Sequence, residues 1–474
     1  MISATKLAVS LLALTFQGAA TTSHHLNRHQ AHQMFARDAY TDVAPVINEG
    51  ENHTYPIVPP PGANYISFPV SAATGADEEL PMYWSQNPQN ATATQAFVMI
   101  HGKLRNGWDY WSIMNDALQS AVKANYPNAD PNAIVTAPQF YSEKYNSGQF
   151  TAKQLAFGDT NQWESGATAI HPSGTSVTVF DAMDALIYEF SDKTKYPKME
   201  RLIFVGHGGG GQLNSRYAIV GKDAPANSTM AIRWIVGDPS SNPYFTLDRP
   251  MYITSLANKT DCPLYNTWRY GYDNFTGTAQ GLKTPQEYFA QTITRDVRWI
   301  VGYQDTTSGG DQECMALLQG GVPRRDRNLC WWRYLNTLAR TSEDLTGFPG
   351  TFTSPLPDYS NISHNVIAHR LTVVEQADHD AAVVFGSAEG RSVLFDNSDN
   401  VLLGWRPQGW VNNATNATQT SSNGTPIATT QDASSSTKST SGAAAMMKEA
   451  QAHLPLIAGV FFTILAASTM LVAA

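Results

Sequence analysis

A glycine-rich turn in the middle of the chain limits what this sequence can fold into. Residues 202–205 form a short apolar run of strand-forming residues, and five of the six residues 206–211 are glycine, after which the spacing becomes helical. This order predicts a strand, a sharp turn and a helix. Two chemistries use that shape. One is a nucleophile elbow of the G-x-S-x-G type, and the other is a dinucleotide-binding turn of the G-x-G-x-x-G type.

Strand-like apolar runs alternate with segments of helical periodicity over most of the chain. Strands are expected at 65–72, 80–85, 96–100, 133–137, 202–205, 232–236, 297–303 and 371–375, and helices at 108–124 and 176–191. This alternation predicts an α/β protein whose central sheet is mostly parallel and is flanked by helices on both faces. Residues 239–292 interrupt the alternation and are rich in aromatic residues and asparagine, so we expect them to form an inserted cap over the strand ends.

The dinucleotide interpretation rests on Gly206, Gly208 and Gly211, which satisfy G-x-G-x-x-G. A dinucleotide fold usually begins with this turn and carries an acidic residue about 20 positions later, at the end of the next strand. Here several strands come first, and the nearest acidic residue at a strand end, Asp238, lies further along. We therefore treat dinucleotide binding as the weaker interpretation and expect no cofactor and no metal ion.

The elbow interpretation is supported by residues on both sides of the turn. Asp305 follows one predicted strand and His379 follows the last, in the chain order nucleophile, acid, histidine of α/β-hydrolases. His101 and Gly102 end an earlier strand, where the loop that binds an oxyanion is expected. Gly209 would supply the second oxyanion-binding amide, because it directly follows the nucleophile position.

The chain resembles the α/β-hydrolase superfamily, and in particular secreted fungal and plant members whose elbow reads G-H-S-x-G-G-Q and is followed by a helix with R-Y-A. The matching residues are 206–212 and 216–218, with further matches at His101-Gly102, 163–166, Gln319-Gly320, Arg324 and His379-Asp380. The resemblance spans most of residues 65–395. It implies an α/β-hydrolase fold and the frame of a carboxylic-ester hydrolase.

Gly208 stands where that family has its nucleophilic serine. Glycine cannot attack a carbonyl, the turn holds no other hydroxyl or thiol, and Ser215 lies too far along the helix to replace the serine. A nucleophile at an elbow has backbone dihedrals that cost on the order of 1–3 kcal/mol in a non-glycine residue. Glycine adopts such dihedrals freely, so the substitution removes the reactive atom and eases folding of the turn.

Three functions remain open. The first is a pseudoenzyme that binds a small ligand, a glycan or a partner protein in the former active-site pocket. The second is a residual hydrolase or lyase, in which the pair of His379 and Asp305 activates water or a bound carbonyl compound. The third is a purely structural wall protein. The net charge of −9, without a basic block, argues against nucleic-acid binding.

The N-terminal segment predicts entry into the secretory pathway. Residues 1–20 combine Lys6, a short apolar run and small residues, which is the pattern of a signal peptide. A polar leader follows over 21–40 and has the composition of a disordered segment. It contains four histidines, for which metal binding is an alternative: His24, His25, His29 and His32.

The C-terminal segment predicts a membrane anchor. The folded domain is expected over 41–410, followed by a stalk rich in serine, threonine and asparagine over 411–441. Residues 442–474 bring a polar spacer and an apolar tail, which is the pattern of a GPI-attachment signal, with Ser441 or Gly442 as the attachment residue. A single transmembrane helix is the alternative, since the tail is long enough to cross a bilayer. Either way we expect an extracellular protein held at the cell surface.

Glycosylation sequons and cysteines agree with that compartment. Sequons of the N-x-S/T type begin at Asn52, Asn90, Asn227, Asn258, Asn274, Asn361, Asn413, Asn416 and Asn423 and predict a glycoprotein. The chain has three cysteines, Cys262, Cys314 and Cys330, so one disulfide and one free thiol are expected. Cys314 with Cys330 is the candidate pair, although sequence alone cannot fix the pairing.

Overall fold

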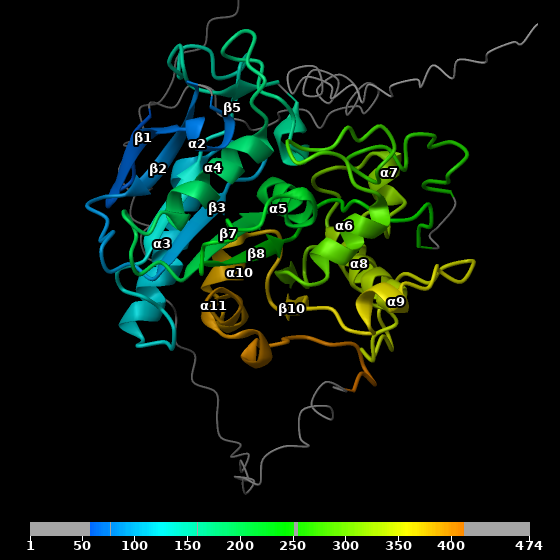
Figure 1. Cartoon of the computed structure of the whole chain (residues 1–474). Coiled ribbons are helices and arrows are strands. Elements are labelled where there is room, and N and C mark those ends of the chain that lie inside the picture. The colour runs from blue at the N-terminus through cyan, green and yellow to red at the C-terminus, as the bar shows by residue number, and fades with distance from the viewer. Residues whose placement is uncertain (1–56, 76, 159, 251–254, 412–474) are drawn as a thin grey trace, which may run out of the picture. The chain divides into compact units, whose positions relative to one another are not determined.

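An eight-stranded sheet runs through the protein (Figure 1), whose computed structural model describes residues 57–411 except 76, 159 and 251–254. The strand order is β1-β2-β4-β3-β7-β8-β9-β10. The strands are β1 (Ala63–Pro69), β2 (Glu79–Ser85), β3 (Gln95–Ile100), β4 (Ile134–Pro138), β7 (Arg201–His207), β8 (Ala231–Gly237), β9 (Asp296–Gly302) and β10 (Arg370–Val374). Strand β2 runs antiparallel to both its neighbours, and the pairs from β4 to β10 are parallel. This order, with one reversed strand beside the edge, is the α/β-hydrolase fold that the sequence predicts.

Helices cover both faces of this sheet (Figure 1). One core lies under α3 (Gly107–Lys123), α10 (Ala381–Gly386) and α11 (Ala388–Phe395), and the other under α4 (Val179–Ser191), α5 (Gly209–Val220) and α8 (Arg324–Ala339). Strand β7 contributes Ile203 and Val205 to the first core and Leu202 and Phe204 to the second. Successive side chains of a strand point to opposite faces, so a strand buried on both faces reads as one unbroken apolar run.

The inserted region is larger than the sequence predicts. The segment 239–292 contains α6 (Pro285–Thr292), and it packs against the connection between β9 and β10, which contains α7 (Cys314–Leu317), α8 and α9 (Ser360–Ser363). A disulfide between Cys262 and Cys314 and an ion pair between Arg269 and Asp311 join the two segments. Both insertions therefore build the wall beside the strand ends. The remaining short elements are α2 (Ser71–Thr74), β5 (Tyr141–Ser142), β6 (Ala156–Phe157), η1 (Asn161–Ser165) and η2 (Ser398–Asn400).

The predicted pairing of Cys314 with Cys330 is wrong, because Cys314 is bonded to Cys262, 52 residues earlier in the chain. Cys330 is a buried free thiol on α8. Its Sγ lies against the backbones of Gly320 and Gly350, where a Cβ on either glycine would come within 2.8 Å of it. Burial raises the pKa of the Cys330 thiol well above its usual value. Cys330, which is nearer to Cys314 in the sequence, is therefore packed into the core and unreactive. Cys262, which is further away in the sequence, is brought close to Cys314 by the insertion.

Several predictions about the chain ends lie outside the described residues: the signal peptide, the leader, the Ser/Thr-rich stalk and the GPI signal with Ser441 and Gly442. The sequons at Asn52, Asn413, Asn416 and Asn423 lie outside them too. Within 57–411, Asn227, Asn274 and Asn361 are exposed, and Asn90 and Asn258 are half-buried. No helix in the described part of the chain is long and apolar enough to cross a membrane. Glycosylation and anchoring stay predictions.

Candidate functional site

The glycine turn forms an elbow between β7 and α5. Gly208 connects the two with φ of 58° and ψ of −115°, a backbone conformation that glycine adopts without strain. The turn also needs close packing: a Cβ on Gly206 would lie 2.1 Å from the Gly210 carbonyl oxygen, so helix and strand touch through their backbones. This geometry places the Cα of Gly208 at the carboxyl edge of the central sheet, where an α/β-hydrolase holds its nucleophile.

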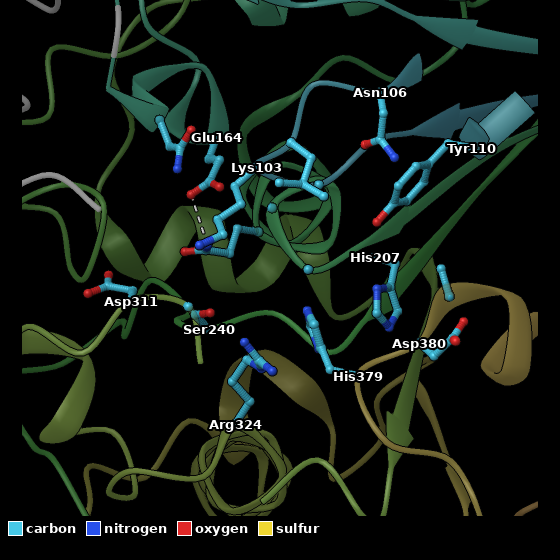
Figure 2. A pocket seen from close by; sticks show the side chains of 18 of the residues that line it. Lys103, Asn106, Tyr110, Glu164, His207, Ser240, Asp311, Arg324, His379 and Asp380 are labelled. Atoms are coloured by element: carbon cyan, nitrogen blue, oxygen red, sulfur yellow. Dashed lines mark hydrogen bonds between the residues drawn. The ribbon is translucent and has the colours of Figure 1, made fainter. Parts of the chain in front are cut away.

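His379 and Asp305 meet in front of the elbow. Figure 2 shows His379 between Arg324 and His207. The Nδ1 of His379 donates a hydrogen bond to Oδ2 of Asp305 at 2.9 Å. Arg324, at the start of α8, donates to both carboxylate oxygens at 2.8 and 2.9 Å. Burial opposes ionisation of Asp305, but the hydrogen bonds from His379 and Arg324 lower its pKa well below the usual range. Asp305 and His379 are therefore held as a hydrogen-bonded pair, with the carboxylate ionised and fixed.

The other ring nitrogen of His379 points at the elbow. A Cβ built on Gly208 would lie 2.9 Å from Nε2 of His379, closer than real Cβ atoms approach a neighbour. The imidazole thus extends into space that a serine side chain would occupy. Burial and the neighbouring His207 lower the pKa of His379. Because Nδ1 carries the proton of the hydrogen bond to Asp305, Nε2 presents a lone pair to the pocket at neutral pH.

His207 and Asp238 form a second buried pair beneath the elbow. The Nε2 of His207 lies 3.2 Å from Oδ2 of Asp238, and the ring of His207 lies 4.5 Å from that of His379, measured between centroids. The amide of Gly302 donates to Asp238 at 2.9 Å. Both side chains are fully buried. Asp238 is therefore enclosed at the end of β8 and cannot bind a ribose, so the dinucleotide interpretation gains no support.

The loop after β3 is held by His101. The amide of Phe140 donates to Nε2 of this ring at 3.0 Å, so the proton is on Nδ1, which donates to the Gly102 carbonyl at 2.8 Å. Burial lowers the pKa of His101 to about 3, so the ring stays neutral. His101 therefore shapes the loop and does not exchange protons. Gly102 and Gly209 both line the pocket beside Gly208, as expected of an oxyanion site.

A pocket of about 440 Å³ opens above the elbow. His379 and Arg324 line one part of it, Glu164 and Gln212 another, and Leu104, Tyr110, Ile113 and Ala381 supply apolar surface. Ser240 is the one serine in the lining, and within the described residues the lining holds no threonine or cysteine. Ser215 is buried elsewhere and donates to Asn242 at 2.6 Å.

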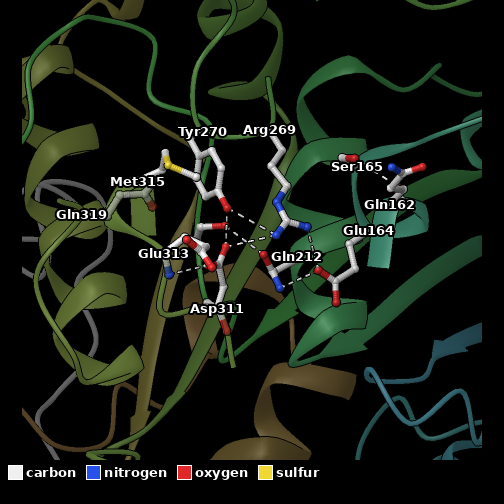
Figure 3. A network of polar contacts seen from close by, with 12 residues as sticks. Gln162, Glu164, Ser165, Gln212, Arg269, Tyr270, Asp311, Glu313, Met315 and Gln319 are labelled. Carbon is white, nitrogen blue, oxygen red and sulfur yellow. Dashed lines mark hydrogen bonds and ion pairs between the residues drawn. The ribbon is translucent and has the colours of Figure 1, made fainter. Parts of the chain in front are cut away.

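A buried polar network forms the wall that carries Glu164 (Figure 3). Gln212 donates to Oε2 of Glu164 at 2.8 Å, and Arg269 lies 3.2 Å from the same oxygen. The Arg269 guanidinium also lies 3.1 Å from Asp311, which accepts a hydrogen bond from Tyr270 at 2.5 Å. One arginine therefore faces two buried carboxyl groups. The sequence analysis assigned no role to any of these residues.

Glu164 is a proton-exchanging group that the sequence analysis missed. Burial raises its pKa from 4.5 to about 7, against the opposing charges of Arg269 and Arg216. Its carboxyl group lies against the elbow, since a Cβ on Gly209 would be 2.4 Å from Oε1. The one available signal was the match at 163–166 between this chain and the family. The pocket thus combines an imidazole whose pKa is lowered with a carboxyl group whose pKa is raised to about 7.

The raised pKa of Glu164 makes stability depend on pH. The folded state holds this proton more tightly than the unfolded chain, so the stabilisation is present below pH 4.5 and is lost as the pH rises towards 7. We expect the free energy of unfolding of the natural protein to fall by about 3 kcal/mol between pH 5 and pH 8 from this group. Urea denaturation at both pH values measures it.

The Glu164→Gln variant should lack this decrease, because the amide is neutral at both pH values and its oxygen still accepts from Gln212. The exposed Glu200 offers a matched control, and Glu200→Gln should follow the natural protein. Equal pH dependence in all three proteins would show that Glu164 does not hold the proton.

The fold is that of an α/β-hydrolase-like protein, and Gly208 lies at the turn between β7 and α5. No protein-family model matches the chain, and no curated protein matches it. Among solved structures, the chain is similar to a poly(3-hydroxybutyrate) depolymerase from Bordetella parapertussis. The two are 18% identical, the similarity covers 71% of this chain and 89% of that chain, and the TM-score is 0.44.

Two further solved structures show a similarity of the same kind. Poly(aspartic acid) hydrolase-1 from Sphingomonas sp. KT-1 is 17% identical, with 69% of this chain and 96% of that chain covered and a TM-score of 0.43. The siderophore hydrolase EstB from Aspergillus nidulans is 10% identical, with 71% and 95% covered and a TM-score of 0.33. Because the identities and TM-scores are this low, these similarities assign no role to any residue of the site.

Proposed function

We propose that this chain is a cell-surface pseudoenzyme with an α/β-hydrolase fold, which binds a small ligand in the pocket above Gly208. The observation that carries the proposal is the elbow itself. Its backbone, the hydrogen-bonded His379 and Asp305 and the pocket are all in place, but the residue in front of the imidazole has no side chain. Covalent catalysis needs a nucleophile within hydrogen-bond reach of its base.

No such nucleophile is found among the described residues. Asp305 is the hydrogen-bond partner of His379 there, through Nδ1, and no hydroxyl donates to Nε2. Ser240 lines the pocket but is not on the elbow, and it has no hydrogen bond to His379. Without the serine, a hydrolase of this kind keeps only the modest catalysis of binding and oxyanion stabilisation.

The pocket retains the features of a ligand site. Ligand pockets combine apolar walls with a few polar groups at fixed places. Here His379 and Glu164 supply polar groups beside the elbow, and Leu104 and Ile113 supply apolar lining. These features support a small ligand that has both polar and apolar parts.

A ligand screen by thermal denaturation tests this proposal. A ligand present at about 100 times its Kd should stabilise the full-length protein by about 2.7 kcal/mol. The Ile113→Trp variant, which fills the pocket from α3, should lose that response, and the exposed Ile170→Trp should keep it. If a ligand stabilises Ile113→Trp as much as the natural protein, it binds outside this pocket, and the assignment of the pocket fails.

The second candidate function is a residual hydrolase or lyase that uses His379 and Asp305. The ionised, fixed Asp305 and the lone pair on Nε2 favour it, because a neutral imidazole of this kind can accept a proton from water. We expect natural protein and His379→Gln to hydrolyse short-chain aryl esters at the same background rate. A rate lost in His379→Gln but kept in Ser240→Ala would instead establish the imidazole as a base acting on water.

Anchoring at the cell surface is part of the proposal and rests on the two terminal segments. Phosphatidylinositol-specific phospholipase C, applied to intact cells, should release the protein if a GPI anchor holds it. Retention by the enzyme-treated membrane would favour the transmembrane alternative.

A further inference from the structure

Three side chains that commonly bind metal ions converge under the elbow. One ligand atom from each of His207, Asp238 and His379 lies within 4.8 Å of the other two. They come from the end of β7, the end of β8 and the loop after β10, so they are far apart in the sequence. Two are fully buried and the third is half-buried and lines the pocket. This convergence was not visible from spacing along the chain.

Asp238 provides a buried negative charge that is poorly balanced. Its ion-pair partner within the described part of the chain is His207, which is charged only when protonated. Arg324 is committed to Asp305, which it contacts through two nitrogens. A buried carboxylate is costly unless a cation neutralises it. A cation bound at Asp238 would balance this carboxyl group.

His379 is prepared as a ligand by its surroundings. Metal-binding histidines usually donate the other ring N–H to a carboxylate, which fixes the ring and its tautomer. The Nδ1 of His379 donates to Asp305 in this way at 2.9 Å, and Arg324 fixes Asp305 in turn. Nε2 remains for coordination. In a serine hydrolase the nucleophile would approach this atom, and Gly208 has no side chain there.

We propose that His207, Asp238 and His379 bind a divalent transition-metal ion of the zinc type. Two imidazoles and one carboxylate are a ligand set that zinc accepts, with bonds of about 2.0–2.2 Å, and three protein ligands leave a fourth position for water or a ligand. The ligand atoms must close from at most 4.8 Å to about 3.3 Å. Small shifts of the three side chains, with the hydrogen bond from Nδ1 of His379 to Asp305 kept, would close this distance. The fourth position would face the pocket.

Metal binding can be measured without knowing the ligand of the pocket. A failure of the metal proposal can therefore be told apart from a failure of the proposed ligand-binding function. The full-length protein, stripped with EDTA, is titrated with Zn²⁺ by calorimetry and with Co²⁺ by visible absorption. All proteins carry alanine at His24, His25, His29 and His32, because the leader histidines are an independent metal-binding candidate. We expect one ion per chain and a Co²⁺ spectrum of low coordination number.

The variants His207→Gln, Asp238→Asn and His379→Gln should each weaken Zn²⁺ binding at least 100-fold. Asp305→Asn, which acts through His379, should weaken it roughly 10- to 100-fold. The exposed His364→Asn is the matched control and should bind like the parent. Gly208→Ser should bind at least tenfold more weakly, because its side chain takes the space before Nε2, and this variant removes no ligand.

Metal-free melting temperatures establish which variants fold. The proposal is overturned if the parent binds no Zn²⁺, or if binding survives the substitutions at 207, 238 and 379 that fold. It is also overturned if Gly208→Ser and Asp305→Asn, which keep all three ligands, bind as tightly as the parent. If Zn²⁺ binds only to protein that retains the four leader histidines, the ion is not bound at the elbow, and the proposal is also overturned.

Discussion

The Gly208→Ser variant should hydrolyse short-chain aryl esters at a kcat at least ~10³-fold above that of the natural protein. The reason is geometric: the new Cβ would lie beside Nε2 of His379, whose Nδ1 is fixed by Asp305. Loss of the nucleophile costs ~2 × 10⁶ in kcat in subtilisin. We expect the gain in kcat to stay below this factor, because the serine Cβ would lie only 2.9 Å from Nε2 of His379. The imidazole must move away before the hydroxyl fits. Steady-state kinetics of the full-length protein measure the gain.

Gly208→Ala is the matched control for this experiment. Serine and alanine both have a Cβ and meet the same dihedrals, φ of 58° and ψ of −115°, so both should lose on the order of 1–3 kcal/mol of stability. Only serine brings a hydroxyl. The double variant Gly208→Ser, His379→Gln should be as inactive as Gly208→Ala. If the serine variant folds and is equally inactive, Gly208 does not occupy a working nucleophile position.

The central sheet could be predicted because local sequence determines it. Strand β7 is buried on both faces, so its apolar run and the glycines that follow read directly as strand and elbow. The order of Gly208, Asp305 and His379 could also be read, because each follows a strand and the carboxyl ends of parallel strands share one edge. The hydrogen bond between Asp305 and His379 follows from that arrangement.

The residues that the sequence did not reveal lie where the chain has little regular structure. Arg269 and Cys262 sit between β8 and α6, and their partners Glu164, Asp311 and Cys314 come from distant loops. No periodicity marks such contacts, and loop length favours the nearer cysteine pair. The pairing of His207 with Asp238 was not predicted for a related reason, because only the adjacency of β7 and β8 brings the two residues together.

Arg269→Met should lower the free energy of unfolding at pH 8 by about 3–5 kcal/mol, because breaking a buried ion pair leaves an uncompensated charge. Arg269 is fully buried and lies 3.2 Å from Glu164 and 3.1 Å from Asp311. Methionine preserves most of the side-chain volume, so the charge is the main change. Urea denaturation measures the loss. Arg325→Met, at a half-buried arginine that forms an ion pair with its neighbour Asp326 and contacts Tyr303, should cost less, because it leaves no buried charge uncompensated.

The loss should be smaller at pH 5, because Glu164, whose pKa is raised to about 7, is already protonated there and leaves no uncompensated carboxylate when Arg269 is gone. A double-mutant cycle tests this cause. In the Glu164→Gln background, Arg269→Met should cost 1–3 kcal/mol less than in the natural protein, since the residues are in contact and the glutamine needs no counter-charge. Equal costs in both backgrounds would mean that Arg269 stabilises the fold through Asp311 and Tyr270, and that Glu164 is held by Gln212 alone. Retention of full stability in Arg269→Met would contradict the buried network itself.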